Sequence, residues 1–143
     1  MAADKQPLID GLNSDLAGEY AAIIQYTHYA AIVTGPFRQE LRAMFLAEVP
    51  DEQGHAQYLA DQIAVLGGTP TTTPRAVAEA RKPKEMLQRI LESEGKAISD
   101  YNERIKQAET YGDTALKVAL ENQVADETNH KQMVERMLSG WPE

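Results

Sequence analysis

One pattern of carboxylates and imidazoles occurs twice in this chain, and the second copy lies 75 residues after the first (94 − 19 = 75). Each copy has a single glutamate followed, 33 residues later (52 − 19 and 127 − 94), by a Glu-x-x-His pair. The six residues are Glu19, Glu52 and His55 in the first copy, and Glu94, Glu127 and His130 in the second. Four carboxylates and two imidazoles can hold two divalent cations only if they meet in space. The pattern therefore constrains the fold as well as the function.

Four segments with helical periodicity carry these residues, and Gly and Pro separate them. The predicted helices cover residues 6–34, 37–66, 83–111 and 113–138. No segment shows the sustained two-residue alternation of a half-buried strand. The sequence predicts an all-α protein of four long helices.

The lengths of the connections restrict how these helices pack. Gly35-Pro36 and Gly112-Asp113 are tight turns, which predict two antiparallel hairpins. Residues 67–82 form a longer connection that can extend to about 50–55 Å. A helix of about 30 residues is about 45 Å long, so this segment can cross the bundle lengthwise. We expect one domain, residues 1–143: a four-helix bundle of two hairpins joined by a long crossover.

The candidate ligands lie within apolar stripes, where solvated charges are not expected. Glu19 falls between Leu16 and Ile23, and Glu94 falls between Leu91 and Ile98. Burying four carboxylates is costly unless cations compensate them. Two divalent ions supply +4 against −4, so the stripes predict a buried site for two metal ions. Iron, manganese and zinc all accept oxygen and imidazole ligands.

The spacing also suggests a role for each residue. Glu and His three positions apart share one helix face, so each Glu-x-x-His pair can grip one ion. The glutamates of these pairs could bridge both ions, while Glu19 and Glu94 would each terminate one. Glu48 lies one turn before the first pair and could serve a third ion or make an ordinary polar contact; its counterpart is Gln123.

Two further pairs are candidates for the surroundings of the site. Asp51 and Asp126 each lie four residues before a histidine, where they could accept its second N–H and fix the ring. Tyr26 and Tyr101 lie two turns after the single glutamates, either as core tyrosines with satisfied hydroxyls or as redox participants.

Composition excludes several other classes of function. The chain has no Cys, which excludes disulfides, thiolate zinc sites and iron–sulfur clusters. Its formal charge is −8 with no block of Lys or Arg, which argues against nucleic acid as a partner. No run approaches the roughly 20 apolar residues that span a bilayer. Residues 1–7 lack the profile of a signal peptide, so we expect no membrane partner and a cytoplasmic location.

The ligand order resembles that of the ferritin-like di-iron carboxylate superfamily, most closely its bacterioferritin and ferritin branch. This resemblance implies two iron ions per chain, oxidation of Fe(II) with dioxygen or peroxide, and storage of Fe(III) within a homo-oligomer. A dimer would be the building unit and a cage the closed form. Two alternatives stay open: an oxidoreductase that retains its metals (a rubrerythrin-like peroxidase, a manganese catalase or an oxidase), and a bundle that only binds metal.

Three features depart from particular branches of this superfamily. Gln53 stands where bacterioferritins have the methionine that binds haem, so we expect no haem. Only residues 139–143 follow the fourth predicted helix, without the fifth helix of ferritins, so the assembly could be smaller or differently closed. Ala97 stands where rubrerythrins have an additional carboxylate, which disfavours a rubrerythrin-type peroxidase.

Overall fold

The structure is a computed structural model that describes residues 4–142. Four helices form the molecule, and residues 4–142 contain no strand. They are α1 (Gln6–Ile32), α2 (Arg38–Val65), α3 (Pro83–Tyr111) and α4 (Thr114–Ser139). The prediction of an all-α protein is confirmed, and every predicted helix end lies within two residues of the observed one. The first three residues and Glu143, which the predicted domain includes, lie outside the described part.

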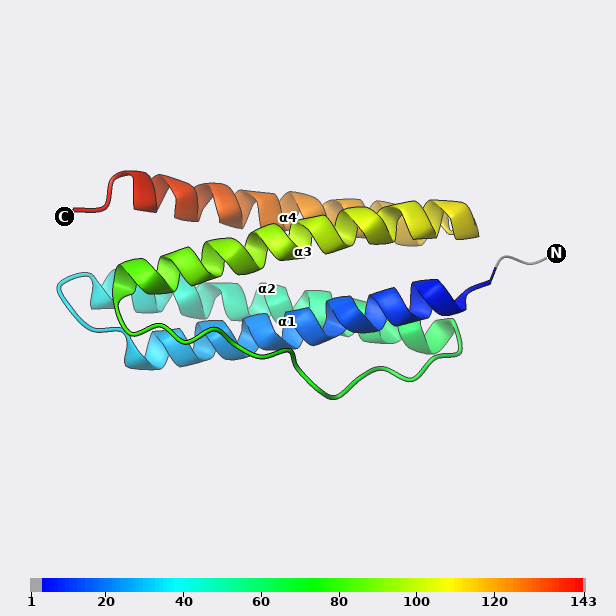
Figure 1. Ribbon diagram of the computed structural model, residues 1–143, viewed down its shortest axis with the longest axis horizontal. Coiled ribbons are helices and arrows are strands. Elements are labelled where there is room, and N and C mark those ends of the chain that lie inside the picture. The colour runs from blue at the N-terminus through cyan, green and yellow to red at the C-terminus, as the bar shows by residue number, and fades with distance from the viewer. Residues whose placement is uncertain (1–3, 143) are drawn as a thin grey trace.

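The helices pair as two antiparallel hairpins, α1 with α2 and α3 with α4 (Figure 1). Gly35 and Gly112 have φ of 98° and 92° in the two turns, a left-handed conformation that a side chain disfavours. Gly112 N–H donates to the Ala108 carbonyl and so closes α3. The Asp113 side chain then accepts the Leu116 N–H at 3.0 Å and starts α4.

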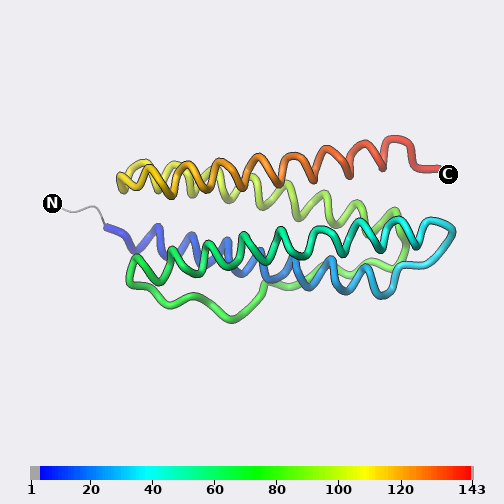
Figure 2. The backbone as a smooth tube through the Cα atoms, turned by 180° about the vertical axis from the view of Figure 1, so that it is seen from behind, coloured from blue at the N-terminus to red at the C-terminus, as the bar shows by residue number. Residues whose placement is uncertain are grey.

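The predicted crossover joins the hairpins and runs along the length of the bundle beside α1 (Figures 1 and 2). Residues 68–81 contain no helical turn. Hydrogen bonds attach this segment to α1 at several points along its length. Thr71 N–H donates to the Asn13 side chain at 2.8 Å, Arg75 N–H donates to the Ala17 carbonyl at 3.0 Å, and the Tyr29 hydroxyl donates to residue 78 at 2.5 Å. The crossover therefore lies fixed over α1.

Buried apolar side chains form two clusters, one toward each end of the bundle. One contains Leu12, Leu16 and Leu59, and the other contains Phe45 and Ile90. Full burial of each such side chain contributes about 1.5–3 kcal/mol. Between the two clusters, each helix places a glutamate in the interior. The apolar ends thus stabilise the bundle around a polar middle layer.

Several apolar residues of the predicted stripes that lie next to the polar layer are less buried than the residues of the two end clusters. Leu16 is fully buried, but Ile23, Leu91 and Ile98 are only partly buried. All three lie on α1 and α3, beside the polar layer.

Within residues 4–142, none of the helices is long and apolar enough to cross a membrane.

Candidate metal centre

The six predicted ligand residues converge in the middle of the bundle. Glu19 comes from α1, Glu94 from α3, and each Glu-x-x-His pair from α2 or α4. Their side-chain atoms fall into two groups of four, in each of which the ligand atoms lie within 4.8 Å of one another. The groups are Glu19, Glu52, His55 and Glu127, and Glu52, Glu94, Glu127 and His130. The groups share two glutamates, the ones expected to bridge two ions.

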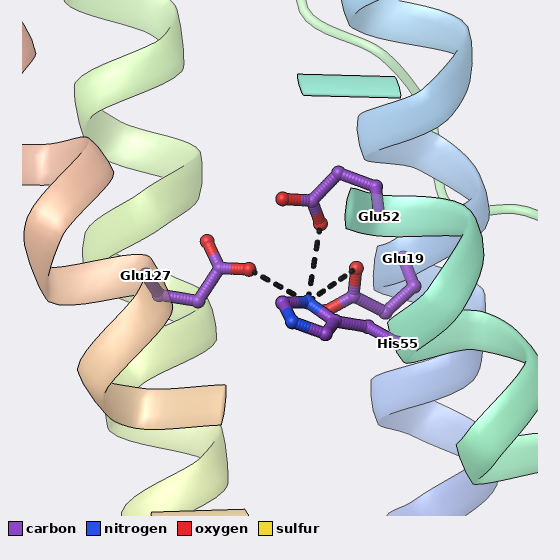
Figure 3. Close-up of side chains that lie close together, drawn as sticks. All are labelled: Glu19, Glu52, His55 and Glu127. Atoms are coloured by element: carbon purple, nitrogen blue, oxygen red, sulfur yellow. Dashed lines mark ion pairs between the residues drawn. The ribbon is translucent and has the colours of Figure 1, made fainter. Parts of the chain in front are cut away.

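The first group surrounds the Nδ1 atom of His55 (Figure 3). This nitrogen lies 3.2 Å from Glu127 Oε1, and 3.8 Å from both Glu19 Oε2 and Glu52 Oε2. Three helices, α1, α2 and α4, supply these side chains. The carboxylates face one nitrogen from different directions, as ligands around a common ion would.

The second group repeats this arrangement around His130 Nδ1. This nitrogen lies 3.7 Å from Glu52 Oε1, and 3.9 Å from both Glu94 Oε1 and Glu127 Oε2. Each contact matches one of the first group when 75 is added to or subtracted from the residue numbers. The two halves of the centre are therefore related by a pseudo-two-fold symmetry that follows the 75-residue repeat.

Buried polar atoms without hydrogen-bond partners gather in this layer. Among the described residues there are eight of them: Glu19 Oε2, Glu48 Oε2, Glu52 Oε1, His55 Nδ1, Glu94 Oε2, Gln123 Oε1, Glu127 Oε1 and His130 Nδ1. Leaving one buried polar atom unpaired costs about 1–3 kcal/mol, and more for a charged group. Six of the eight belong to the predicted ligands, so two cations would supply the missing partners. The oxygen and imidazole donors fit iron, manganese or zinc.

Burial and the neighbouring charges shift the pKa values of the side chains in the cluster. Burial raises the pKa of Glu52 and of Glu127. Burial also acts to raise the pKa of Glu19, but the neighbouring Glu52 and His55 side chains outweigh it and lower that pKa. Desolvation acts to lower the pKa of His55 and His130, but the surrounding carboxylates outweigh it and raise both. A metal ion must therefore displace protons.

The two tyrosines contact the cluster across the α1–α3 pair. The Tyr26 hydroxyl donates to Glu94 Oε1 at 2.5 Å, and the Tyr101 hydroxyl donates to Glu19 Oε1. In the sequence, each tyrosine lies two turns after the glutamate of its own helix. Side chains on a helix tilt toward its N-terminus, so Glu19 tilts away from Tyr26 on the same helix. On the antiparallel α3, Glu94 tilts toward Tyr26, and the two side chains meet.

The two aspartates also contact the opposite half of the centre, which corrects the predicted pairing within one helix. Asp126 Oδ2 lies 3.1 Å from His55 Nε2, and Asp51 Oδ2 lies 3.6 Å from His130 Nε2. Nε2 lies on the far side of the imidazole from Cβ, so it reaches the neighbouring helix instead of its own. An acceptor at Nε2 keeps the proton there and leaves Nδ1 free to bind an ion.

Glu48 makes the two halves of the centre unequal. Its Oε2 lies 2.7 Å from His130 Nε2, although the pair is not aligned as a hydrogen bond. The counterpart Gln123 has a buried, unpartnered Oε1 instead. Glu48, Asp51 and His130 also form a third group of possible metal ligands. The sequence suggested a third ion or a polar contact for Glu48, and the ion pair with His130 is the contact observed.

Another glutamate of α3 and the third histidine of the chain lie outside the centre. Glu92 is exposed on α3 and pairs with Arg89 at 2.7 Å. His28 is exposed on α1.

A buried ion pair was missed by sequence reasoning: Arg104 Nε donates to Asp15 Oδ2 at 2.8 Å. No spacing signal marks it, because the repeat places apolar or aromatic residues at the matching positions.

Comparisons with known proteins agree with this geometry. A model of the ferritin-like domain matches residues 9–142. The chain belongs to the ferritin-like family. It is 30% identical to a bacterial ferritin of Pseudomonas aeruginosa over 132 residues, which cover 92% of this chain and 86% of that one. A ferritin-like, diiron-carboxylate protein from Bacillus anthracis has a solved structure with a TM-score of 0.94 and 51% identity, covering 96% and 99% of the two chains.

These likenesses confirm the predicted family and fold class. This ferritin-like chain has a buried cluster of carboxylates and imidazoles that could bind metal ions, in a family of diiron-carboxylate proteins. The single helix bundle supplies all six predicted ligand residues from one polypeptide.

Proposed function

We propose that this protein is a ferroxidase, which oxidises Fe(II) to Fe(III) with dioxygen or peroxide. One observation carries the proposal: the two ligand groups share Glu52 and Glu127. Two ions held by shared carboxylates lie close enough for one oxidant to take an electron from each. Iron is then the substrate, and the protein's own contribution is to hold two ions side by side.

Each side chain has a role in this proposal. Glu52 and Glu127 bridge the two ions, and Glu19 and Glu94 each bind one of them. The histidines bind through Nδ1, the atom that faces the carboxylates. The two tyrosine hydroxyls hold one oxygen of each terminal glutamate and so orient the other toward an ion.

The reaction balances with the two oxidants as follows. Two Fe(II) ions lose one electron each. Dioxygen takes up these two electrons and two protons and becomes hydrogen peroxide. Hydrogen peroxide as the oxidant takes up two electrons and two protons and becomes two water molecules. Protons displaced by the incoming ions from the raised-pKa groups of the cluster are available for either step.

We further propose that the Fe(III) product is stored or detoxified in a homo-oligomer assembled from dimers, in the cytoplasm. The likeness to the Pseudomonas aeruginosa ferritin supports this assignment. An oxidoreductase that retains its metals is the alternative. This alternative predicts a small assembly that keeps about two ions per chain, one for each of the two groups that share Glu52 and Glu127.

Iron uptake separates these possibilities. Fe(II) is added in air to the metal-free protein, and the iron retained per chain and the particle size are then measured. Storage predicts far more iron than the ligand groups can hold, within a large particle. Iron retained only at the ligand groups, in a dimer or similar small assembly, would favour the alternative. Absence of any oxidation would contradict both and leave a bundle that only binds metal.

Two substitutions test the assignment of the centre. Glu94→Ala and His130→Ala should abolish rapid oxidation while leaving the helical circular dichroism unchanged, because each removes a ligand from the second group. Glu92→Ala and His28→Ala are matched controls, because they remove the same side-chain types at exposed positions of α3 and α1. They should oxidise Fe(II) at the wild-type rate. Rapid oxidation in both ligand variants would show that the centre is wrongly assigned.

A further inference from the structure

A cavity of about 130 Å³ reaches the candidate centre from the α1–α3 side. The facing sides of α1 and α3 form its walls, and crossover residues 75–78 cover it. The glutamates of the centre, Glu19, Glu52, Glu94 and Glu127, also line it. The cavity therefore connects the metal centre with the part of the surface that the crossover covers.

The lining residues of the two walls are related by the 75-residue repeat, as the ligands of the centre are. Adding 75 to the α1 positions 18, 19, 21, 22, 25 and 26 gives the α3 positions 93, 94, 96, 97, 100 and 101, and all twelve residues line the cavity. The pseudo-two-fold axis thus relates the two walls, as it relates the two halves of the metal centre. A molecule in the cavity would face both ion positions in the same way.

Four buried carboxylate oxygens of the cavity lining have no hydrogen-bond partner, and two of them belong to the terminal glutamates. Glu19 is 3% exposed and Glu94 is 4% exposed, and the Oε2 atom of each lacks a hydrogen bond. Their Oε1 atoms are held by the two tyrosines, which also line the cavity. The orientation of both terminal glutamates is thus fixed at the inner end of the cavity.

The cavity exists because several side chains on its walls are small. Gly18, Ala21 and Ala22 line the α1 wall, and Ala97 lines the α3 wall. Arg75 and Lys96 are cationic lining residues that retain solvent exposure, with Asp100 between them. Arg75 also donates to the Ser14 carbonyl at 2.7 Å, which holds the covering segment in place. Asp100 pairs with both cations and offsets one of the two positive charges, so this side of the cavity does not concentrate cations and does not repel a small uncharged molecule.

We propose that this cavity is the route and binding site of the oxidant, a small uncharged molecule with an O–O bond, and that Ala22 and Ala97 set its size limit. The inference rests on the proposed ferroxidase function. Dioxygen and hydrogen peroxide share this chemistry, and both are small enough for a cavity of about 130 Å³. The oxidant enters from the α1–α3 side and meets both ions at the shared inner end.

Filling the cavity tests the proposal. Ala97→Leu adds bulk to one wall, and Ala115→Leu is the matched control at an exposed alanine of α4. The rate of Fe(II) oxidation is measured against dioxygen and, separately, against peroxide concentration. Ala97→Leu should raise the KM for at least one oxidant about tenfold, equivalent to about 1.4 kcal/mol of added barrier. Its KM for Fe(II) and the number of Co(II) ions bound should match those of the wild type.

The same rates for wild type and Ala97→Leu with both oxidants, at unchanged Co(II) binding, would overturn the inference and leave the ferroxidase proposal standing. A lower rate with dioxygen alone, peroxide alone or both identifies the oxidant that uses the cavity. If Ala97→Leu loses Co(II) binding, Ala22→Leu takes its place.

Xenon decides the inference independently of iron chemistry. Xenon occupies apolar parts of protein cavities, and Ala21, Ala22 and Ala97 form such a part here. Crystals of the wild type under xenon pressure should therefore show it between Ala22 and Ala97. Crystals of Ala97→Leu should not. Absence of xenon from the wild-type cavity would overturn the inference. If the wild type oxidises no Fe(II), the ferroxidase proposal is contradicted and the xenon result alone decides whether small uncharged molecules reach the centre.

Discussion

Each terminal glutamate of the centre is oriented by a tyrosine from the opposite helix of the α1–α3 pair. Tyr101 is buried, and its hydroxyl donates to Glu19. Residues that orient a metal ligand typically contribute a factor of about 10–100 to metal affinity. The hydroxyls therefore affect metal binding although they bind no metal in this arrangement.

Removing one of these hydroxyls should weaken one half of the centre. Tyr101→Phe should lower the affinity for Co(II) about tenfold at the half that contains Glu19, because the carboxylate loses its fixed orientation. Isothermal titration calorimetry measures this affinity. Tyr20→Phe is the control: Tyr20 is next to Glu19 in sequence and is partly buried. Equal affinities for the two variants would show that the tyrosine hydroxyl does not orient the ligand.

Metal binding should release protons. Burial raises the pKa of Glu52 and Glu127, and the carboxylates outweigh desolvation to raise the pKa of His55 and His130. Groups with a raised pKa hold protons to higher pH, and these protons must leave when an ion binds. Metal affinity should therefore increase as pH rises through the titration of the cluster. Calorimetry in buffers of different ionisation enthalpy counts the protons, and a count of zero would contradict this description of the metal-free centre.

The α1–α3 pair is also held by a buried ion pair on one side of the centre only. Asp15 and Arg104 are 5% and 8% exposed, and Arg104 donates to both Asp15 oxygens. The matching positions in the repeat (15 + 75 and 104 − 75) are Ile90 and Tyr29. At the opposite end, apolar packing therefore takes the place of this ion pair.

Breaking this pair should destabilise the bundle strongly. Asp15→Ala leaves the buried Arg104 charge without its carboxylate, which should cost about 3–5 kcal/mol in free energy of unfolding. Glu103→Ala breaks the exposed pair between Glu103 and Lys106 and should cost less than about 1 kcal/mol. Urea unfolding of the metal-free protein compares the two variants. A similar, small loss in both would mean that Asp15 does not stabilise the packing of α1 against α3.

For the molecule as a whole, the repeat and the Gly and Pro positions were enough to predict four helices, two hairpins and a lengthwise crossover. Helical periodicity places a residue on a face, so the meeting of the six ligand residues could be predicted as well. Periodicity does not determine how far one helix is shifted along another. The bond between Tyr26 and Glu94 and the contact between His55 and Asp126 depend on that shift, so they could not be predicted.

The cavity depends on the path of the crossover, which has no periodic pattern. Arg75 lies in a segment rich in Thr and Pro, and nothing in its spacing indicates that it would bond to Ser14 on α1. The Asp15–Arg104 pair is equally hidden, because it breaks the repeat on which the prediction of the centre depends.

Anomalous diffraction from crystals grown with iron or manganese tests the central claim most directly. We predict two metal peaks in each chain, both in contact with Glu52 and Glu127. One should also contact Glu19 and His55 Nδ1, and the second should contact the equivalent residues on α3 and α4. A single peak, peaks only on the surface, or no bound metal in the bundle interior would contradict the account.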